Sequence, residues 1–150
     1  MIIDIDTDDR FKLLSNFSEN HFEIDGVPCY SMEGFLQSLK FNDPDNQIQV
    51  CKLVGKKAKF AGKKKKWWQT QVLFWKGVPI DRHSLEYQRL IDHAFKCLSG
   101  NKEFSKTLLQ TEDFEITHSS GKNDPYRTIL TQVEFVSRLD KIRELLKTKK

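Results

Sequence analysis

The sequence lacks the segments that would take it into a membrane or across one. No apolar run approaches the roughly 20 residues that span a bilayer. A secretory signal needs a basic start followed by a long apolar stretch, whereas the N-terminal segment carries Asp4, Asp6, Asp8 and Asp9 and has neither feature. We therefore expect a cytoplasmic protein with no membrane partner.

Cysteine and histidine are scarce and show no ligand spacing. The three cysteines include no C-x-x-C pair, and the four histidines are scattered along the chain. This pattern predicts neither a disulfide framework nor a zinc site. The chain also has no Walker loop, no G-x-G-x-x-G and no G-x-S-x-G nucleophile elbow. We expect no metal site and no redox cofactor.

The composition fits one globular domain. The chain has 150 residues, of which 38% are hydrophobic and 31% are charged. That length is enough to bury a core without disulfides or metals. We expect a single domain over residues 1–150 with its core at about 11–147, and the sequence indicates no oligomeric state.

Apolar periodicity and capping residues predict a mainly helical α+β fold. Asp25-Gly26, the favoured pair for a tight primed turn, predicts a hairpin over 22–30. Residues 56–66 are expected to be loop or frayed helix, 69–77 fit either a short helix or an extended run, and 114–117 alternate like a strand. Helices are expected at 31–42, 44–54, 101–110 and 131–147, and a further helix that ends at 98 is expected to begin at Ser84 or Asp81.

A lysine-rich segment carries much of the positive charge of a chain whose net charge is +4. Residues 52–66 contain eight lysines and no acid, and Trp67 and Trp68 follow directly. A solvated lysine surface would explain such a run. Alternatively, the lysines bind phosphate on a nucleotide or nucleic acid, and the tryptophans stack on bases. Because a purely solvated face has no need of tryptophan, we favour a phosphate-binding surface that holds DNA through Lys52–Lys66.

The helix expected at 31–42 places three reactive groups on one face. Glu33, Gln37 and Lys40 follow one another at i, i+4 and i+7, while the apolar residues share another face. A carboxyl group can protonate a leaving nitrogen or activate water, and a lysine can attack an anomeric carbon once the sugar ring opens. Spacing alone, however, favours a solvated polar face with one helical ion pair.

A second polar cluster precedes the last helix. Residues 118–124 collect an imidazole, two hydroxyls, an amide and a carboxylate around Gly121. Glycine lets a backbone approach a ligand closely. An ordinary polar turn has the same composition, so the cluster alone does not establish a site.

Together these segments resemble the NADAR family of N-glycosidases, also called YbiA-like. The resemblance lies in LSNF at 14–17, YSMEGFLQSLKF at 30–41, GKKA at 55–58, WKG at 75–77, EYQ at 86–88, THSSGKND at 117–124 and LTQVEF at 130–135. It covers residues 14 to 146 in matching order. It implies a mainly helical, YbiA-like α+β domain that cuts N-glycosidic bonds. The bond lies in a ribose-phosphate intermediate of riboflavin synthesis or between ADP-ribose and guanine in DNA.

The resemblance also implies roles for individual positions. Glu33 and Lys40 match the family's helix glutamate and lysine, and we expect them to act as acid/base and nucleophile. Asp124 matches its loop acid and would hold ribose hydroxyls or water. Further substrate contacts are expected from Asn16, Phe17, Tyr30, Ser31, Gln37, Gly55, Lys56, Trp68, Trp75, His118 and Ser119.

The loop before the last helix departs from the family pattern. Many members read D-x-x-W-G where this chain reads Asp124-Pro125-Tyr126-Arg127-Thr128. The tryptophan that would stack on a base is therefore missing from that position. Trp68 or Trp75 would have to supply the stack instead.

These observations favour removal of ADP-ribose from guanine in nucleic acid, because eight lysines suit a polyanion better than a small phosphate. One alternative is cleavage of a ribosyl-phosphate riboflavin intermediate. Others are a non-catalytic module that binds ADP-ribose or nucleic acid, and a nucleic-acid binder without a nucleotide pocket. A binder would use the lysines and tryptophans but would have no need of Glu33, so the role of Glu33 separates the enzyme from the binders.

Overall fold

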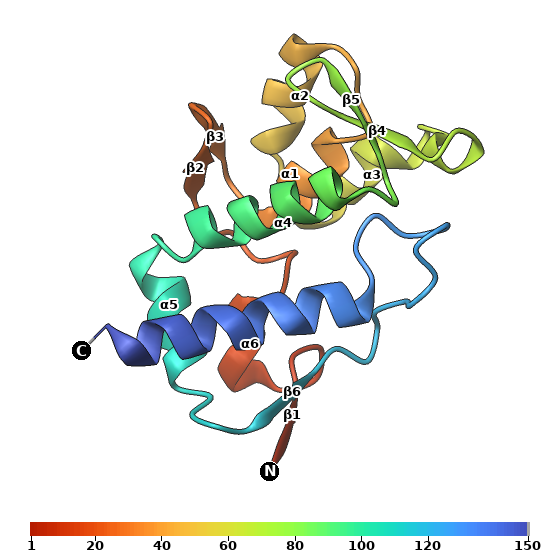
Figure 1. The fold of residues 1–150 in the computed structure, drawn as a ribbon. Helices are drawn as coiled ribbons and strands as arrows, with labels where there is room; N and C mark the ends of the chain where they lie inside the picture. The colour runs from red at the N-terminus through yellow and green to blue at the C-terminus, as the bar shows by residue number, and fades with distance from the viewer. Residues whose placement is uncertain (150) are drawn as a thin grey trace.

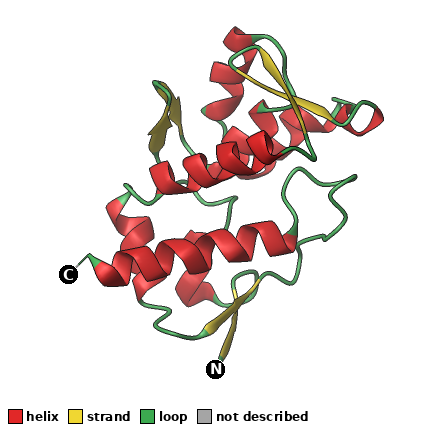
Figure 2. Cartoon of the chain, viewed as in Figure 1, coloured by secondary structure: helices red, strands yellow, loops and turns green. Residues whose placement is uncertain are grey.

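A computed structural model describes residues 1–149, and within them the strands form three separate two-stranded sheets among the helices (Figures 1 and 2). The mainly helical α+β fold is therefore as expected. In chain order the elements are β1 (Ile2–Asp4), η1 (Asp9–Leu14), β2 (Phe22–Ile24), β3 (Val27–Cys29), α1 (Met32–Ser38), α2 (Pro44–Cys51), α3 (Gly55–Lys63), η2 (Trp67–Gln69), β4 (Val72–Trp75), β5 (Val78–Asp81), α4 (Leu85–Leu98), α5 (Lys102–Leu109), β6 (Glu115–Thr117) and α6 (Gln132–Thr148).

Two hairpins use the same kind of turn. β2 pairs with β3 around Asp25 and Gly26, whose φ angles are +51° and +82°. β4 pairs with β5 around Lys76 and Gly77, whose φ angles are +52° and +83°. Successive positive φ angles are typical of the primed turns that match strand twist. The first hairpin is confirmed, and the second settles residues 72–75 as a strand rather than a helix.

The capping residues define where most helices begin. The side chains of Ser31, Asp43, Ser84, Asn101 and Thr131 each accept a hydrogen bond from the first turn of the helix that follows. Such caps satisfy amides that have no partner inside the helix. The predicted starts are therefore confirmed, with Ser84 and not Asp81 capping α4, whereas α1 ends at Ser38, earlier than expected.

The lysine-rich segment, expected to be loop or frayed helix, contains the regular helix α3. Its buried residues are Ala58 and Gly62, four positions apart and therefore on one face. α3 packs on α1, and small residues at such an interface let two helices approach closely. The lysines lie on the remaining faces, which gave the sequence its irregular, polar pattern.

A parallel pairing joins the two halves of the chain. β1 pairs with β6 in the register Ile2 with Glu115, Ile3 with Ile116 and Asp4 with Thr117. This N-terminal strand was not expected, because three residues give no recognisable alternation and the partner lies far along the chain. The pairing brings the aspartates that follow β1 next to the loop that follows β6.

The core lies between α1 and a pair of longer helices. Figure 1 shows α4 and α6 running side by side across the molecule, with β1 and β6 on one side and the two hairpins on the other. Phe35, Leu36 and Leu39 of the α1 segment are buried in this core. Within residues 1–149, every helix is too short or too polar to cross a membrane.

Candidate active site

A cavity of about 490 Å³ lies where four segments meet. That volume is typical of a small-molecule site. A larger groove of about 590 Å³ between α4 and α6 contains none of the predicted site residues. The lining of the smaller cavity consists of Asp6, residues 15–17, Glu33, Leu36 and Gln37 of α1, Lys59 of α3, and His118, 120–122 and 127–130 of the β6–α6 loop.

Glu33 lies in the cavity wall and is only 9% exposed. Burial raises the pKa of this carboxyl, against the opposing effects of a hydrogen bond from Gln37 and of the charges of Lys40, Lys59 and His118. Gln37 Nε2 donates to Glu33 Oε2 at 2.7 Å. A raised pKa lets a carboxyl group exchange protons nearer to neutral pH. The polar face of this helix is thus buried, and not the solvated face that spacing alone favoured.

Gln37 is held between Glu33 and α3. Its Oε1 is buried and has no hydrogen-bond partner among residues 1–149. A Cβ built on Gly62 would lie 1.9 Å from that oxygen and 3.0 Å from Lys40 Cδ. A side chain at position 62 would therefore displace the Gln37 amide from its present position.

Lys40 continues the stripe but does not line the cavity. Burial lowers the pKa of its amine, the carboxylate of Glu33 raises it, and the charge of Lys59 lowers it again. The net direction is downward, as a lysine nucleophile requires. The structure thus places Lys40 beside the cavity, with its aliphatic chain against Gly62.

Asp6 and His118 form a second pair of titratable groups in the lining. Asp6 Oδ2 lies 2.9 Å from His118 Nδ1, although the two atoms are not aligned as a hydrogen bond. The same oxygen accepts from the Ser120 backbone N–H at 2.8 Å, and Asp4 Oδ1 accepts from the Ser119 N–H at 3.2 Å. Asp6 was not expected in this cavity, because its position depends on the pairing of β1 with β6.

Cations line the cavity from two elements. Lys59 comes from α3, and Lys122 and Arg127 come from the β6–α6 loop. Sequence reasoning expected Lys56 here, but Lys56 is exposed outside the lining, one turn earlier on α3. The three cations make this cavity suited to phosphate groups.

The far end of the loop is anchored by a buried arginine. Arg82 is 1% exposed, donates from Nε to Thr128 O at 3.1 Å and forms a bidentate pair with Glu134 at 3.1 and 2.7 Å. Tyr87 Oη donates to Ile129 O. These interactions hold the loop between the hairpin segment and the start of α6.

Asp124 lies outside the cavity in which we expected it. It is exposed and lies outside the cavity lining. Its Oδ1 accepts from the Tyr126 N–H at 3.0 Å, and its carbonyl accepts from the N–H groups of Arg127 at 3.1 Å and Thr128 at 3.0 Å. An aspartate that bonds its own backbone two residues on forms a turn. In this structure Asp124 therefore fixes the turn that carries Tyr126 and Arg127 and does not line the cavity.

Three residues predicted to touch substrate lie outside the cavity lining and contact other parts of the protein. Ser31 caps α1 and donates to Leu53 O at 2.8 Å. Tyr30 stacks on His21 with ring centroids 4.4 Å apart. Trp75 is 8% exposed, and its Nε1 donates to Asp25 Oδ2 at 2.8 Å. None of the three lines the cavity, because these internal interactions occupy them.

The remaining predicted residues divide between the cavity and its surroundings. Asn16, Phe17, Gln37 and His118 lie in the lining with Glu33. Gly55, with φ +60°, begins α3, and Ser119 is exposed beside the lining. Trp68 is 53% exposed and lines a separate cavity. Within the described residues, no group of three or more His, Cys, Asp or Glu side chains is placed to hold a metal ion.

Comparison with known proteins gives both a family and a fold. The profile of a family described as bacteriophage protein GP30.3 matches residues 11–144. An Enterobacteria phage T4 protein, described as an uncharacterized 17.1 kDa protein in the Gp30–rIII intergenic region, is 36% identical over 139 residues, covering 89% of this chain and 90% of that protein. The NMR structure of the E. coli protein YbiA superposes with a TM-score of 0.62 at 16% identity, over 99% of this chain and 85% of that chain. The YbiA-like fold is thus confirmed, and the chain belongs to the bacteriophage GP30.3 family.

Proposed function

We propose that this protein is an N-glycosidase that hydrolyses a base–ribose bond in a phosphorylated substrate. The observation that carries the proposal is the buried Glu33 carboxyl, whose pKa is raised, in the wall of a cavity that also presents Lys59, Lys122 and Arg127. A proton donor of this kind serves the leaving nitrogen of a base. Cations around it serve the phosphate on the ribose.

The chemistry divides between Glu33 and Lys40. The neutral amine of Lys40 attacks C1′ of the ribose, and the bond from C1′ to the base nitrogen breaks with its electron pair going to the base. The nitrogen lone pair then forms the C1′ imine as the bond from C1′ to the ring oxygen breaks and the ring opens. Of the two amine protons, one ends on the released base and the other on the ring oxygen, and Glu33 shuttles them. Water then hydrolyses the C1′ imine, which restores the lysine amine and releases the sugar as an aldehyde that closes its ring.

Lys40 must move to take part in this reaction. Lys40 does not line the cavity, and its aliphatic chain lies against Gly62. The four methylene groups of a lysine allow such a swing, and the lowered pKa of the amine keeps more of it neutral. If the lysine does not swing, the same cavity supports direct attack by water activated by Glu33.

The preferred substrate is ADP-ribosylated guanine in nucleic acid. Three lining cations suit a pyrophosphate better than a single phosphate. The exposed lysines at 63–66 extend the positive surface beyond α3, where a polyanionic strand would bind. A ribosyl-phosphate riboflavin intermediate is the smaller alternative and would not use those lysines.

The test is to incubate the protein with DNA that carries ADP-ribose on guanine. We expect free ADP-ribose and DNA with its guanine restored, both identified by mass spectrometry. If the protein cleaved a ribosyl-phosphate riboflavin intermediate faster than ADP-ribosylated DNA, the smaller molecule would be its preferred substrate. Binding of both substrates without cleavage would contradict the proposal and leave a binding module.

A further inference from the structure

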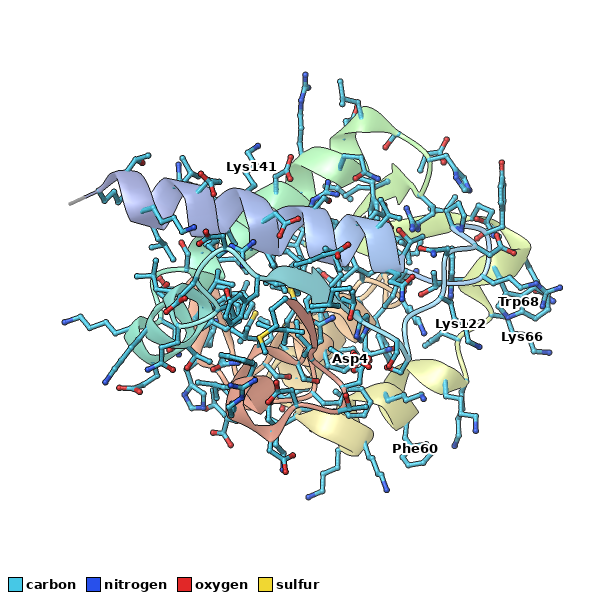
Figure 3. All side chains as sticks on the ribbon, turned by 90° about the horizontal axis from the view of Figure 1, so that it is seen from below. Asp4, Phe60, Lys66, Trp68, Lys122 and Lys141 are labelled. Atoms are coloured by element: carbon cyan, nitrogen blue, oxygen red, sulfur yellow. The ribbon has the colours of Figure 1, made fainter. Side chains whose placement is uncertain are left out.

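A second cavity, also of about 490 Å³, lies next to the candidate active site. Its lining contains two large exposed rings, Trp68 at 53% and Tyr126 at 59% exposure, together with Gln71 and Arg127. Trp68 follows α3 and Tyr126 belongs to the β6–α6 loop, so the two walls come from distant parts of the sequence. Figure 3 shows Trp68 and Lys66 projecting at one end of the molecule, with Lys122 of the loop on the same side.

Gln71 joins the two walls. Its Nε2 donates both to Trp68 O at 2.9 Å and to Tyr126 O at 2.8 Å. Its Oε1 lies 2.8 Å from His83 Nε2. The backbone of Gln71 has a φ of +59°, which is unfavourable for a residue other than glycine and directs the side chain to this position.

The Tyr126 ring is supported although it is exposed. His83 packs against it with ring centroids 4.2 Å apart and an interplanar angle of 33°. The Tyr126 N–H donates to Asp124 Oδ1 at 3.0 Å, so the turn fixes the backbone as well. The Tyr126 ring is thus held in place by His83 and linked through Gln71 to the segment that carries the exposed Trp68 ring. Two such rings are preorganised to stack on a planar ligand.

Arg127 connects this cavity with the candidate active site, because it lines both. A guanidinium group binds phosphate in a bidentate manner and stacks with planar groups. If a ligand placed its sugar in the first cavity and a planar ring in the second, the phosphate groups between them would lie next to Arg127.

We propose that the second cavity is a nucleobase subsite, in which a base stacks with Trp68 and Tyr126 while its phosphate binds Arg127. The inference rests on the proposed function for the position of the scissile ribose in the first cavity. The stacked base is either the distal base of a dinucleotide-like substrate such as ADP-ribose or a neighbouring base of a nucleic-acid strand. Both present the same chemistry, a base attached to a phosphate.

The intrinsic fluorescence of the protein gives a direct test, because Trp67 and Trp75 are 7% and 8% exposed and Trp68 is the accessible indole. The probes are ADP-ribose, ribose 5-phosphate and a short single-stranded oligonucleotide. We expect ADP-ribose to quench Trp68 and ribose 5-phosphate, which has no base, to leave it unchanged. Equal quenching by both probes would overturn the subsite.

Affinities measured by calorimetry complete the test. Removal of one stacking ring is expected to weaken binding about 5- to 150-fold. We expect that effect for ADP-ribose in Trp68→Ala and in Tyr126→Ala, with binding of ribose 5-phosphate unchanged. Phe60→Ala is the matched control, because Phe60 is an exposed ring on α3 outside both cavities, at 59% exposure. Figure 3 shows Phe60 well away from Trp68.

These measurements distinguish a base of ADP-ribose from a base of a nucleic-acid strand. They also test the subsite separately from the proposed N-glycosidase function. Weakened oligonucleotide binding with unchanged ADP-ribose binding would assign the subsite to a neighbouring base of a strand. Unchanged binding of both probes in both variants would overturn the subsite. Because these measurements need no turnover, a protein that shows the expected binding but cleaves nothing would keep the subsite and lose only the proposed function.

Discussion

At the residue scale, Glu33 shows how burial changes the chemistry of an ordinary side chain. The sequence placed Glu33, Gln37 and Lys40 on one helical face, and the structure shows that face covered by α3 and by the β6–α6 loop. The pKa of the carboxyl is raised and that of the lysine lowered, chiefly because both are buried. A pattern along one helix cannot reveal such cover, since it depends on segments far away in the chain.

The raised pKa of Glu33 predicts that this residue costs stability at neutral pH. The folded protein binds the Glu33 proton more tightly than the unfolded chain does, so the contribution of this group falls as pH rises from the ordinary value of 4.5 through the raised folded value. We expect Glu33→Gln to unfold at a higher temperature than the wild type at neutral pH. The difference should disappear below pH 4.5.

Thermal unfolding followed by circular dichroism at several pH values checks this prediction. Glu23→Gln serves as the control, because Glu23 is exposed in β2. A Glu33→Gln protein that is less stable than the wild type at neutral pH would show that the carboxylate has compensating interactions.

The proposed attack of the Lys40 amine on the ribose predicts a covalent intermediate during turnover. Borohydride reduces an imine to a stable amine, so its addition should trap the sugar on the protein, and peptide mass mapping should place the adduct at Lys40. Lys40→Arg should be nearly inactive, whereas Lys57→Arg, an exposed change on α3, should keep its activity. An active Lys40→Arg protein with no trapped adduct would assign the attack to water.

At the element scale, the packing of α3 on α1 depends on one glycine. A Cβ at Gly62 would lie 1.9 Å from Gln37 Oε1. Overpacking typically costs about 1–3 kcal/mol, and alanine gains roughly 0.5–1 kcal/mol over glycine within a helix. We expect Gly62→Ala to lower the free energy of unfolding by up to about 2 kcal/mol and to reduce activity, because Gln37 is pushed away from Glu33.

Urea unfolding measures the stability change for this variant, and an assay on the same preparation measures activity. Phe60→Ala is the matched control, since it alters an exposed position in the same helix that lies outside both cavities. Unchanged stability and activity in Gly62→Ala would mean that α3 moves away from α1 without cost.

The local signals predicted helix starts and tight turns well. Caps at Ser31, Asp43, Asn101 and Thr131 and the Asp25-Gly26 turn are governed by residues within a few positions, so they are visible in the sequence. The elements that were missed depend on distant partners. β1 is a strand because it pairs with β6, and α3 packs on α1 through small residues. Neither segment therefore shows a strong hydrophobic pattern in its own sequence.

The candidate site was predictable to the same extent. Glu33, Gln37, Asn16, Phe17 and His118 line the cavity, and their motifs are continuous in the sequence. Asp6 lies in the cavity lining because β1 pairs with β6. Lys59, and not the expected Lys56, faces the cavity because α3 is a helix. Asp124 lies outside the lining, and its side chain bonds its own turn. These three assignments required the three-dimensional arrangement.

At the scale of the whole molecule, positive charge is concentrated in residues 52–66, which contain eight lysines and no acid. If Lys63–Lys66 guide a polyanionic substrate, their replacement by glutamine should weaken cleavage of modified DNA and leave a free ADP-ribosyl nucleoside almost unaffected. The slope of log affinity against log salt should fall by about one for each phosphate that the protein no longer binds. Binding assays across a salt series check this.

The matched control replaces four exposed lysines on other helices by glutamine, so that the net charge changes by the same amount. Lys96, Lys102, Lys106 and Lys141 are exposed lysines of α4, α5 and α6. Figure 3 shows Lys141 on a different side of the molecule from Lys66. Equal effects in the two fourfold variants would indicate a general influence of net charge and not a binding surface.

The most direct test of the proposed active site compares single-turnover release of ADP-ribose from guanine-modified DNA by the wild type and by Glu33→Gln. Removal of a general acid/base typically slows a reaction by about a hundred- to ten-thousandfold. We predict release by the wild type, a decrease of that size in Glu33→Gln, and substrate binding by both proteins. Release by Glu33→Gln at the wild-type rate, or binding by both proteins with release by neither, would contradict the assignment of this cavity as an N-glycosidase site.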